Sequence, residues 1–147
     1  MFARNALLLL FAVLIAGTCG RKLPLRGVTL EVDRAANEQS PVPTEVVFVF
    51  ERSLVEKVGA LAAEEWFRQR DQIRNDYPSG YRSLYWELVP GQTLRIDPIP
   101  RTHSGAHAVF LFARYTTEGA HRLRLDPVRI ADVHLGESGP VLRNAVD

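Results

Sequence analysis

A short apolar run in the first half of the chain places the strongest constraint on the fold. From Val46 to Phe50 the sequence reads Val-Val-Phe-Val-Phe. Valine and phenylalanine are typical of strands, and a run without polar alternation indicates a strand that is covered on both faces. We therefore expect a central strand over residues 44–51.

Weaker strand-like segments surround this run. Residues 27–35 alternate, with Val28, Leu30 and Val32 on one face and polar side chains on the other, as in a strand that has one buried face. Turn signals such as Pro90-Gly91 separate the further strands that we expect, at 81–89, 93–96, 106–115, 121–125 and 129–135. After these strands we expect only a turn and a polar C-terminal tail, residues 137–147.

Many short strands at hairpin spacing favour a mainly β fold, a β-sandwich of about seven to eight strands. The chain of 147 residues has room for one such domain, which we expect over 27–136. The apolar members of the alternating segments should form the sandwich core: Val28, Leu30, Val47, Val49, Leu84, Trp86, Val109, Leu111, Leu123 and Val133.

A helical insertion at about 53–76 interrupts the β pattern. Ser53 and Glu56 have the spacing of a capping box at its start, and Pro78 with Gly80 ends it. Its second half should carry an apolar stripe, formed by Trp66, Ile73 and Tyr77, and a solvated basic face, formed by Arg68, Arg70 and Arg74.

The N-terminus has the order of a secretory signal. Arg4 precedes an apolar run that ends in small residues and Cys19, the only cysteine. The segment Ile15-Ala16-Gly17-Thr18-Cys19 resembles the lipobox of bacterial lipoproteins, which implies removal of residues 1–18, acylation of Cys19 and a linker over 19–26. Gly20, rather than aspartate, then favours sorting to the outer membrane. The alternative is ordinary cleavage near Gly20, with Cys19 discarded.

Composition and motifs argue against several function classes. The 18 basic and 17 acidic residues balance, and no basic run is interleaved with aromatics, so we expect no nucleic-acid partner. No motif of a hydrolase, a metalloprotease or a nucleotide-binding loop is present, so we expect no enzymatic activity, no cofactor and no small-molecule substrate. His103 and His107 lie in a turn-like stretch without a partner thiol or carboxylate, and we expect no metal site there.

Several short motifs together resemble the type VI secretion outer-membrane lipoprotein family, known as TssJ. After the lipoprotein signal and first strand come Asn37 and Ser40-Pro41-Val42, then the apolar strand Glu45-Val46-Val47-Phe48-Val49-Phe50. Residues 62–67 occupy the helical excursion of the family, and Leu88-Val89-Pro90-Gly91 matches its next turn. The helical segment is longer than usual in the family and contains Trp66-Phe67-Arg68, which indicates a divergent branch.

This resemblance implies a transthyretin-like β-sandwich that is tethered to the outer membrane and faces the periplasm. There it would bind the periplasmic domain of an inner-membrane secretion-complex protein and so anchor the complex. The first inter-strand loop takes part in that contact in the family, and it corresponds here to Asn37, Glu38, Gln39, Ser40, Pro41, Val42 and Pro43. These residues have no evident role in the core, so we expect that replacing 37–40 would leave folding nearly unchanged.

A second function remains open, that of a lipoprotein that binds cell-wall or surface glycans. Aromatic platforms suit sugars, and this chain offers Trp66, Phe67, Tyr81, Tyr85 and Trp86. Their helical and strand spacing assigns them more simply to the core. A hydrolase is the third and least favoured function.

Overall fold

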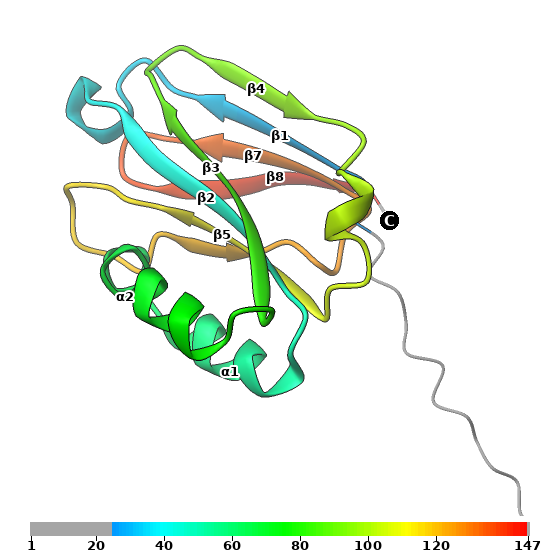
Figure 1. Cartoon of the computed structure of the whole chain (residues 1–147). Helices are drawn as coiled ribbons and strands as arrows, with labels where there is room; N and C mark the ends of the chain where they lie inside the picture. The colour runs from blue at the N-terminus through cyan, green and yellow to red at the C-terminus, as the bar shows by residue number, and fades with distance from the viewer. Residues whose placement is uncertain (1–24, 147) are drawn as a thin grey trace, which may run out of the picture.

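The computed structural model describes residues 25–146, which form two packed β-sheets with two helices outside one of them (Figure 1). The strands are β1 (Gly27–Val32), β2 (Val42–Val49), β3 (Tyr81–Leu88), β4 (Thr93–Ile96), β5 (Ala108–Ala113), β6 (Arg122–Arg124), β7 (Ile130–Leu135) and β8 (Pro140–Val146). The helices are α1 (Arg52–Ala60) and α2 (Ala63–Asp76), and two short 3₁₀ turns are η1 (Ala36–Gln39) and η2 (Arg101–His103). The expected mainly β sandwich with a helical insertion is confirmed. Cys19 and the expected signal peptide lie outside the described residues.

Each sheet has four strands, in the orders β4-β1-β7-β8 and β3-β2-β5-β6. β1 and β7 run parallel, and the other paired strands of the described region are antiparallel. The two sheets pack face to face, and the helices cover the outer face of the sheet that contains β2 (Figure 1).

The central strand β2 is buried on both faces, as its apolar run indicates. Val46 and Phe48 point into the space between the sheets. Val47 and Val49 point the other way and pack with the helices, in a second cluster that contains Trp66. The expectation that Val47 and Val49 belong to the sandwich core is therefore wrong. A run that is apolar at every position has no polar side to show which residues face which layer.

The other eight residues expected in the sandwich core lie there. Five of them are fully buried in the cluster between the sheets, namely Val28, Leu30, Val109, Leu111 and Val133. Leu84, Trp86 and Leu123 are partly buried and pack against the same cluster.

The helical layer begins differently from the expectation. The Ser53 hydroxyl donates a hydrogen bond to the Glu51 carboxylate at 2.6 Å, and no side chain caps α1, so the predicted capping box is wrong. Glu65 instead accepts the Ala62 backbone N–H at 3.0 Å at the start of α2, which satisfies one unpaired amide of that helix end. No helix in the described region has the length and apolar character needed to cross a membrane.

A buried acid holds α2 against the sheet. Glu45 on β2 is 1 % exposed, and its carboxylate accepts hydrogen bonds from Trp66 Nε1 at 2.9 Å and from the Arg70 guanidinium at 2.6 Å. Burial lowers the pKa of Arg70, but the hydrogen bond and charge of Glu45 outweigh this effect and raise it overall. The expected solvated face of Arg68, Arg70 and Arg74 is thus wrong for Arg70, while Arg68 and Arg74 are exposed.

The C-terminal segment is a strand rather than the expected polar tail. β8 pairs antiparallel with β7, with Val133 opposite Leu142 and Leu135 opposite Pro140. Leu142 is partly buried against the sandwich core, while Val141 is 57 % exposed. The domain therefore extends past residue 136. In the sequence of β8 one partly buried apolar residue, Leu142, was too weak a pattern to predict a strand.

The two ends of the sandwich carry different features. The chain enters the domain at one end, where Leu25 lies near the turn that contains η2, and η1 lies at the opposite end (Figure 1). We call the first the entry end and the second the η1 end. The connection between β5 and β6 also reaches the η1 end.

Candidate partner-binding site

The loop proposed from sequence begins with an unusual backbone turn. Asn37, Glu38 and Gln39 have φ values of 49, 56 and 64°, so three consecutive non-glycine residues adopt the left-handed conformation. This conformation costs roughly 1–2 kcal/mol for each such residue, and asparagine tolerates it best of the three. The turn therefore persists because contacts around it hold it in place.

Asn37 provides those contacts. Its side chain donates to the Pro41 carbonyl at 2.9 Å and accepts the Thr116 backbone N–H at 2.7 Å. Its own carbonyl accepts the Ser40 N–H at 3.0 Å. With an exposure of only 4 %, Asn37 joins the loop to the β5–β6 connection. The expectation that this residue has no structural role is wrong.

The seven predicted contact residues fall into two groups. Val42 is fully buried as the first residue of β2, where it pairs with Leu88, so it cannot present its side chain to a partner. Asn37 is buried as well. The other five are at least partly accessible, with Glu38, Gln39 and Pro41 exposed and Ser40 and Pro43 half-buried.

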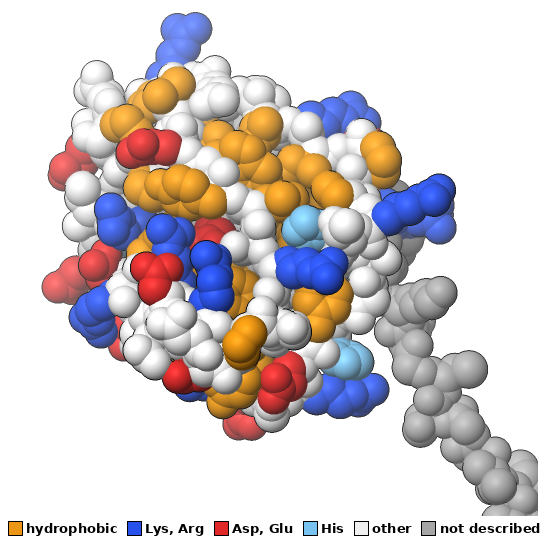
Figure 2. Space-filling view, in the orientation of Figure 1, with side chains coloured by type: hydrophobic (Ala, Val, Ile, Leu, Met, Phe, Trp, Pro, Cys, Tyr) orange, Lys and Arg blue, Asp and Glu red, His pale blue; other side chains and the backbone are white. Residues whose placement is uncertain are grey.

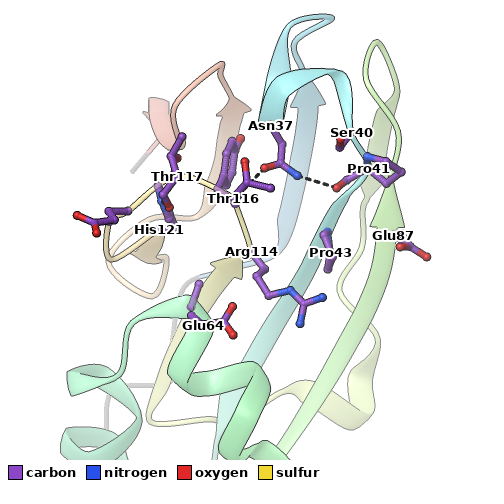
Figure 3. A pocket seen from close by; sticks show the side chains of 14 residues that line it. Asn37, Ser40, Pro41, Pro43, Glu64, Glu87, Arg114, Thr116, Thr117 and His121 are labelled. Carbon is purple, nitrogen blue, oxygen red and sulfur yellow. Dashed lines mark hydrogen bonds between the residues drawn. The ribbon is translucent and has the colours of Figure 1, made fainter.

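A hollow of about 680 Å³ lies beside the loop and extends the candidate site (Figure 3). Four segments form its walls: the loop itself, the edge of β3 at Glu87, the start of α2 at Glu64, and residues 114–121. The Arg114 side chain points into the space between Pro43 and Glu64 (Figure 3). Three carboxylates line the same hollow as the Arg114 guanidinium, namely those of Glu64, Glu87 and Glu118. The hollow thus offers separate acidic and basic positions.

Residues 115–121 form the wall that the sequence did not reveal. The Tyr115 ring stacks on the His121 ring with centroids 4.9 Å apart, and the Tyr115 hydroxyl donates to the Gly136 carbonyl at 2.9 Å. Burial, with a smaller effect from Asp33, raises the pKa of the Tyr115 phenol. His121 has a φ of 43° and lies just before β6, not within the strand as expected. Because Thr116 and Asn37 are far apart in sequence, only the fold brings this wall to the loop.

The remaining histidines lie apart from other potential metal ligands, since no group of three or more such residues gathers in the described region. His103 lies in η2 and packs edge-on against Phe48, with ring centroids 4.8 Å apart. Burial, together with the nearby charge of Arg82, lowers the pKa of His103. His107 is exposed just before β5.

The aromatic residues considered for glycan binding are mostly inward-facing. Trp66 is fully buried and Tyr81 is 6 % exposed, while Phe67 and Trp86 are partly buried. Tyr85 is 47 % exposed, but the Arg70 guanidinium lies 5.2 Å from the centre of its ring. No open aromatic platform results from these five side chains.

Comparison with solved structures identifies the fold. The lipoprotein TssJ1 of the type VI secretion system from Pseudomonas aeruginosa superimposes with a TM-score of 0.59 at 18 % identity, over 83 % of this chain and 98 % of that chain. The chain has the fold of a type VI secretion lipoprotein. Serratia marcescens Lip, a membrane-bound component of the same system, gives a TM-score of 0.53 at 16 % identity, over 83 % of this chain and 97 % of Lip.

A chain from a type VI membrane complex shares this TssJ-like fold, with a TM-score of 0.59 at 11 % identity, over 82 % of this chain and 99 % of that chain. No protein-family model matches the sequence. A search of curated proteins also gives no match. The resemblance read from the short motifs is therefore confirmed by the fold, and the low identities agree with a divergent branch.

Proposed function

We propose that this protein is a non-enzymatic envelope lipoprotein that links a type VI secretion membrane complex to the outer membrane. In this proposal Cys19 is acylated, the domain faces the periplasm, and the η1 end binds the periplasmic domain of an inner-membrane component. The TssJ-like fold over most of the chain is the observation that carries the proposal.

The arrangement of the domain supports this role. The chain enters at one end of the sandwich, and the loop 37–43 lies at the other (Figure 1). A lipid on Cys19 would hold the entry end near the membrane, so the loop and its hollow would project toward a partner. The loop is also held in shape by Asn37, so it would lose little conformational entropy on binding.

The test of partner binding uses the exposed loop residues alone. The triple variant Glu38→Ala, Gln39→Ala, Pro41→Ala should keep the fold and lose capture of the periplasmic domain of the proposed inner-membrane partner. A matched triple variant at the entry end, Arg101→Ala, Thr102→Ala, His107→Ala, should still capture it. If the loop variant captured the partner as well as the entry-end variant does, the partner contact would lie outside the loop.

The test of anchoring is metabolic labelling with a fatty-acid analogue, followed by membrane fractionation. The wild-type protein should carry the label in the outer-membrane fraction, and Cys19→Ser should carry none. Label in the inner-membrane fraction would contradict the outer-membrane location, and label on Cys19→Ser would contradict the acylation site.

Glycan binding receives less support than protein binding. A sugar needs an accessible aromatic face, and Tyr85, the most exposed of the five candidate rings, is a single ring with the Arg70 guanidinium 5.2 Å from its centre.

A further inference from the structure

The entry end contains a second hollow, of about 430 Å³, which the proposed partner contact does not use. Its apolar lining comes from the segment before β1, from β2 and β5 of one sheet, and from the connection between β4 and β5: Leu25, Phe48, Val109, Pro98, Ile99, Pro100 and Ala106. Arg26 and Arg101 also line it, and both are exposed. The hollow thus combines an apolar interior with a basic rim.

Backbone hydrogen bonds fix the position of Arg26 beside the hollow. The Arg26 carbonyl accepts the Ile99 N–H at 2.7 Å, and the Arg26 N–H donates to the Arg129 carbonyl at 2.7 Å. Arg129 is exposed as well. The acid in the lining, Asp97, already pairs with Arg95 at 3.1 Å. The rim therefore retains a net positive charge.

The chain outside the structure limits how far this end can lie from a lipid anchor. Residues 20–24 are all that separate Cys19 from Leu25, and even a fully extended segment of this length spans only about 20 Å. These residues include Arg21 and Lys22. Basic side chains are also visible on the surface at the entry end of the domain (Figure 2).

We propose that the entry end is a membrane-binding surface that takes an anionic phospholipid, with its phosphate at Arg26 and Arg101 and its acyl portion in the apolar hollow. Basic residues near an anionic membrane surface attract its headgroups. The apolar lining supplies contacts for the hydrocarbon, which a free phosphate would not use. The lipid on Cys19 would bring the surface to the membrane, and this contact would set the orientation of the domain there.

Vesicle sedimentation tests this proposal without the tether. A chain that begins at Gly20 keeps every described contact, because the described domain starts at Leu25. It should sediment with phosphatidylcholine vesicles that contain phosphatidylglycerol and much less with phosphatidylcholine alone. The double variant Arg26→Gln, Arg101→Gln should bind the anionic vesicles roughly 30-fold more weakly, from about 1 kcal/mol for each arginine.

The control removes the same charge elsewhere. Arg34 and Arg68 are also exposed arginines, in the loop after β1 and on α2, and Arg34→Gln, Arg68→Gln should bind nearly as well as the wild type. Equal losses in the two double variants would show a general charge attraction and overturn the proposal. A wild-type chain without preference for anionic vesicles would overturn it too.

A second measurement separates a lipid site from a phosphate site. Short-chain phosphatidylglycerol, below its micelle concentration, should shift the amide NMR signals of Ile99, His103 and Ala106, and glycerol phosphate at the same concentration should not. Equal shifts from both compounds would mean that the hollow does not take the acyl portion. Because neither measurement uses the secretion partner, a failure here would leave the proposed anchoring function untouched.

Discussion

Glu45 on β2 and Arg70 on α2 form an ion pair with 2.6 Å between their charged atoms, and the Glu45 side chain is only 2 % exposed. The pair joins the helical layer to the sheet that it covers. Trp66, which also donates to Glu45, stacks on Phe112 with ring centroids 5.0 Å apart. The buried acid and the aromatic stack thus help to attach the insertion to the sandwich, together with the apolar cluster between the helices and the sheet.

Glu45→Gln should therefore destabilise the fold. The variant leaves the Arg70 charge without its partner, and because Arg70 keeps 27 % exposure, water offsets part of the loss. We expect the free energy of unfolding to fall by about 1–3 kcal/mol, measured by urea denaturation. Arg95→Gln, which breaks the exposed pair with Asp97, serves as the control and should cost less than about 1 kcal/mol. An equal fall in the free energy of unfolding in both variants would show that the buried pair stabilises the fold no more than the exposed pair.

Asn37→Ala should destabilise the η1 end. It leaves the Thr116 N–H without an acceptor and places alanine at a φ of 49°, so we expect a loss of about 1–3 kcal/mol and faster hydrogen exchange at Thr116. Gln39→Gly is the matched change, since Gln39 is exposed and glycine suits its φ of 64°. That variant should not lose more than about 0.5 kcal/mol and can gain stability, because glycine removes the cost of the left-handed conformation while it raises the entropy of the unfolded chain. Unchanged exchange at Thr116 in Asn37→Ala would contradict the proposed bridge.

Tyr115→Phe should alter the dependence of stability on alkaline pH. Burial raises the pKa of Tyr115 above its value of about 10 in the unfolded chain. The unfolded state therefore releases this proton first as the pH rises, and the wild type loses stability above about pH 10.

Near neutral pH Tyr115→Phe should cost about 1 kcal/mol, from the lost hydrogen bond to Gly136. Above about pH 10 this difference should narrow, because phenylalanine has no proton to release. Thermal unfolding of both proteins between neutral and alkaline pH measures the effect. Tyr81, whose pKa burial also raises, contributes equally to both proteins. If stability fell with rising pH by the same amount in both proteins, the pKa of Tyr115 would be the same in the folded and the unfolded state.

Substitutions in β8 distinguish a strand from a tail. Leu142 packs against the sandwich core, so Leu142→Ala should lower the free energy of unfolding by about 1–3 kcal/mol. Its neighbour Val141 is 57 % exposed, and Val141→Ala should change stability by no more than about 0.5 kcal/mol. Chemical denaturation of the two variants gives the comparison. Similar small changes in both would mean that this segment contributes little to the core.

The sequence alone determined the helical insertion and the described strands other than β8, because each of these is a local pattern. The period of apolar residues in 27–35 and the unbroken run from Val46 to Phe50 reflect burial directly, and β1 and β2 lie where these patterns predict. The TssJ-like fold followed from the same local signals and a few short motifs.

Tertiary structure alone decided which layer each residue faces and which distant residues meet. Nothing local shows that Val47 faces the helices, that Glu45 binds Arg70, or that Asn37 bonds to Thr116. Such contacts join segments that are distant in sequence. The alternation of side chains along a strand shows that the strand has two faces, but it does not show which element covers each face. Which residues of the loop are accessible, and the hollow beside the loop, therefore depend on contacts at the η1 end that only the folded chain makes.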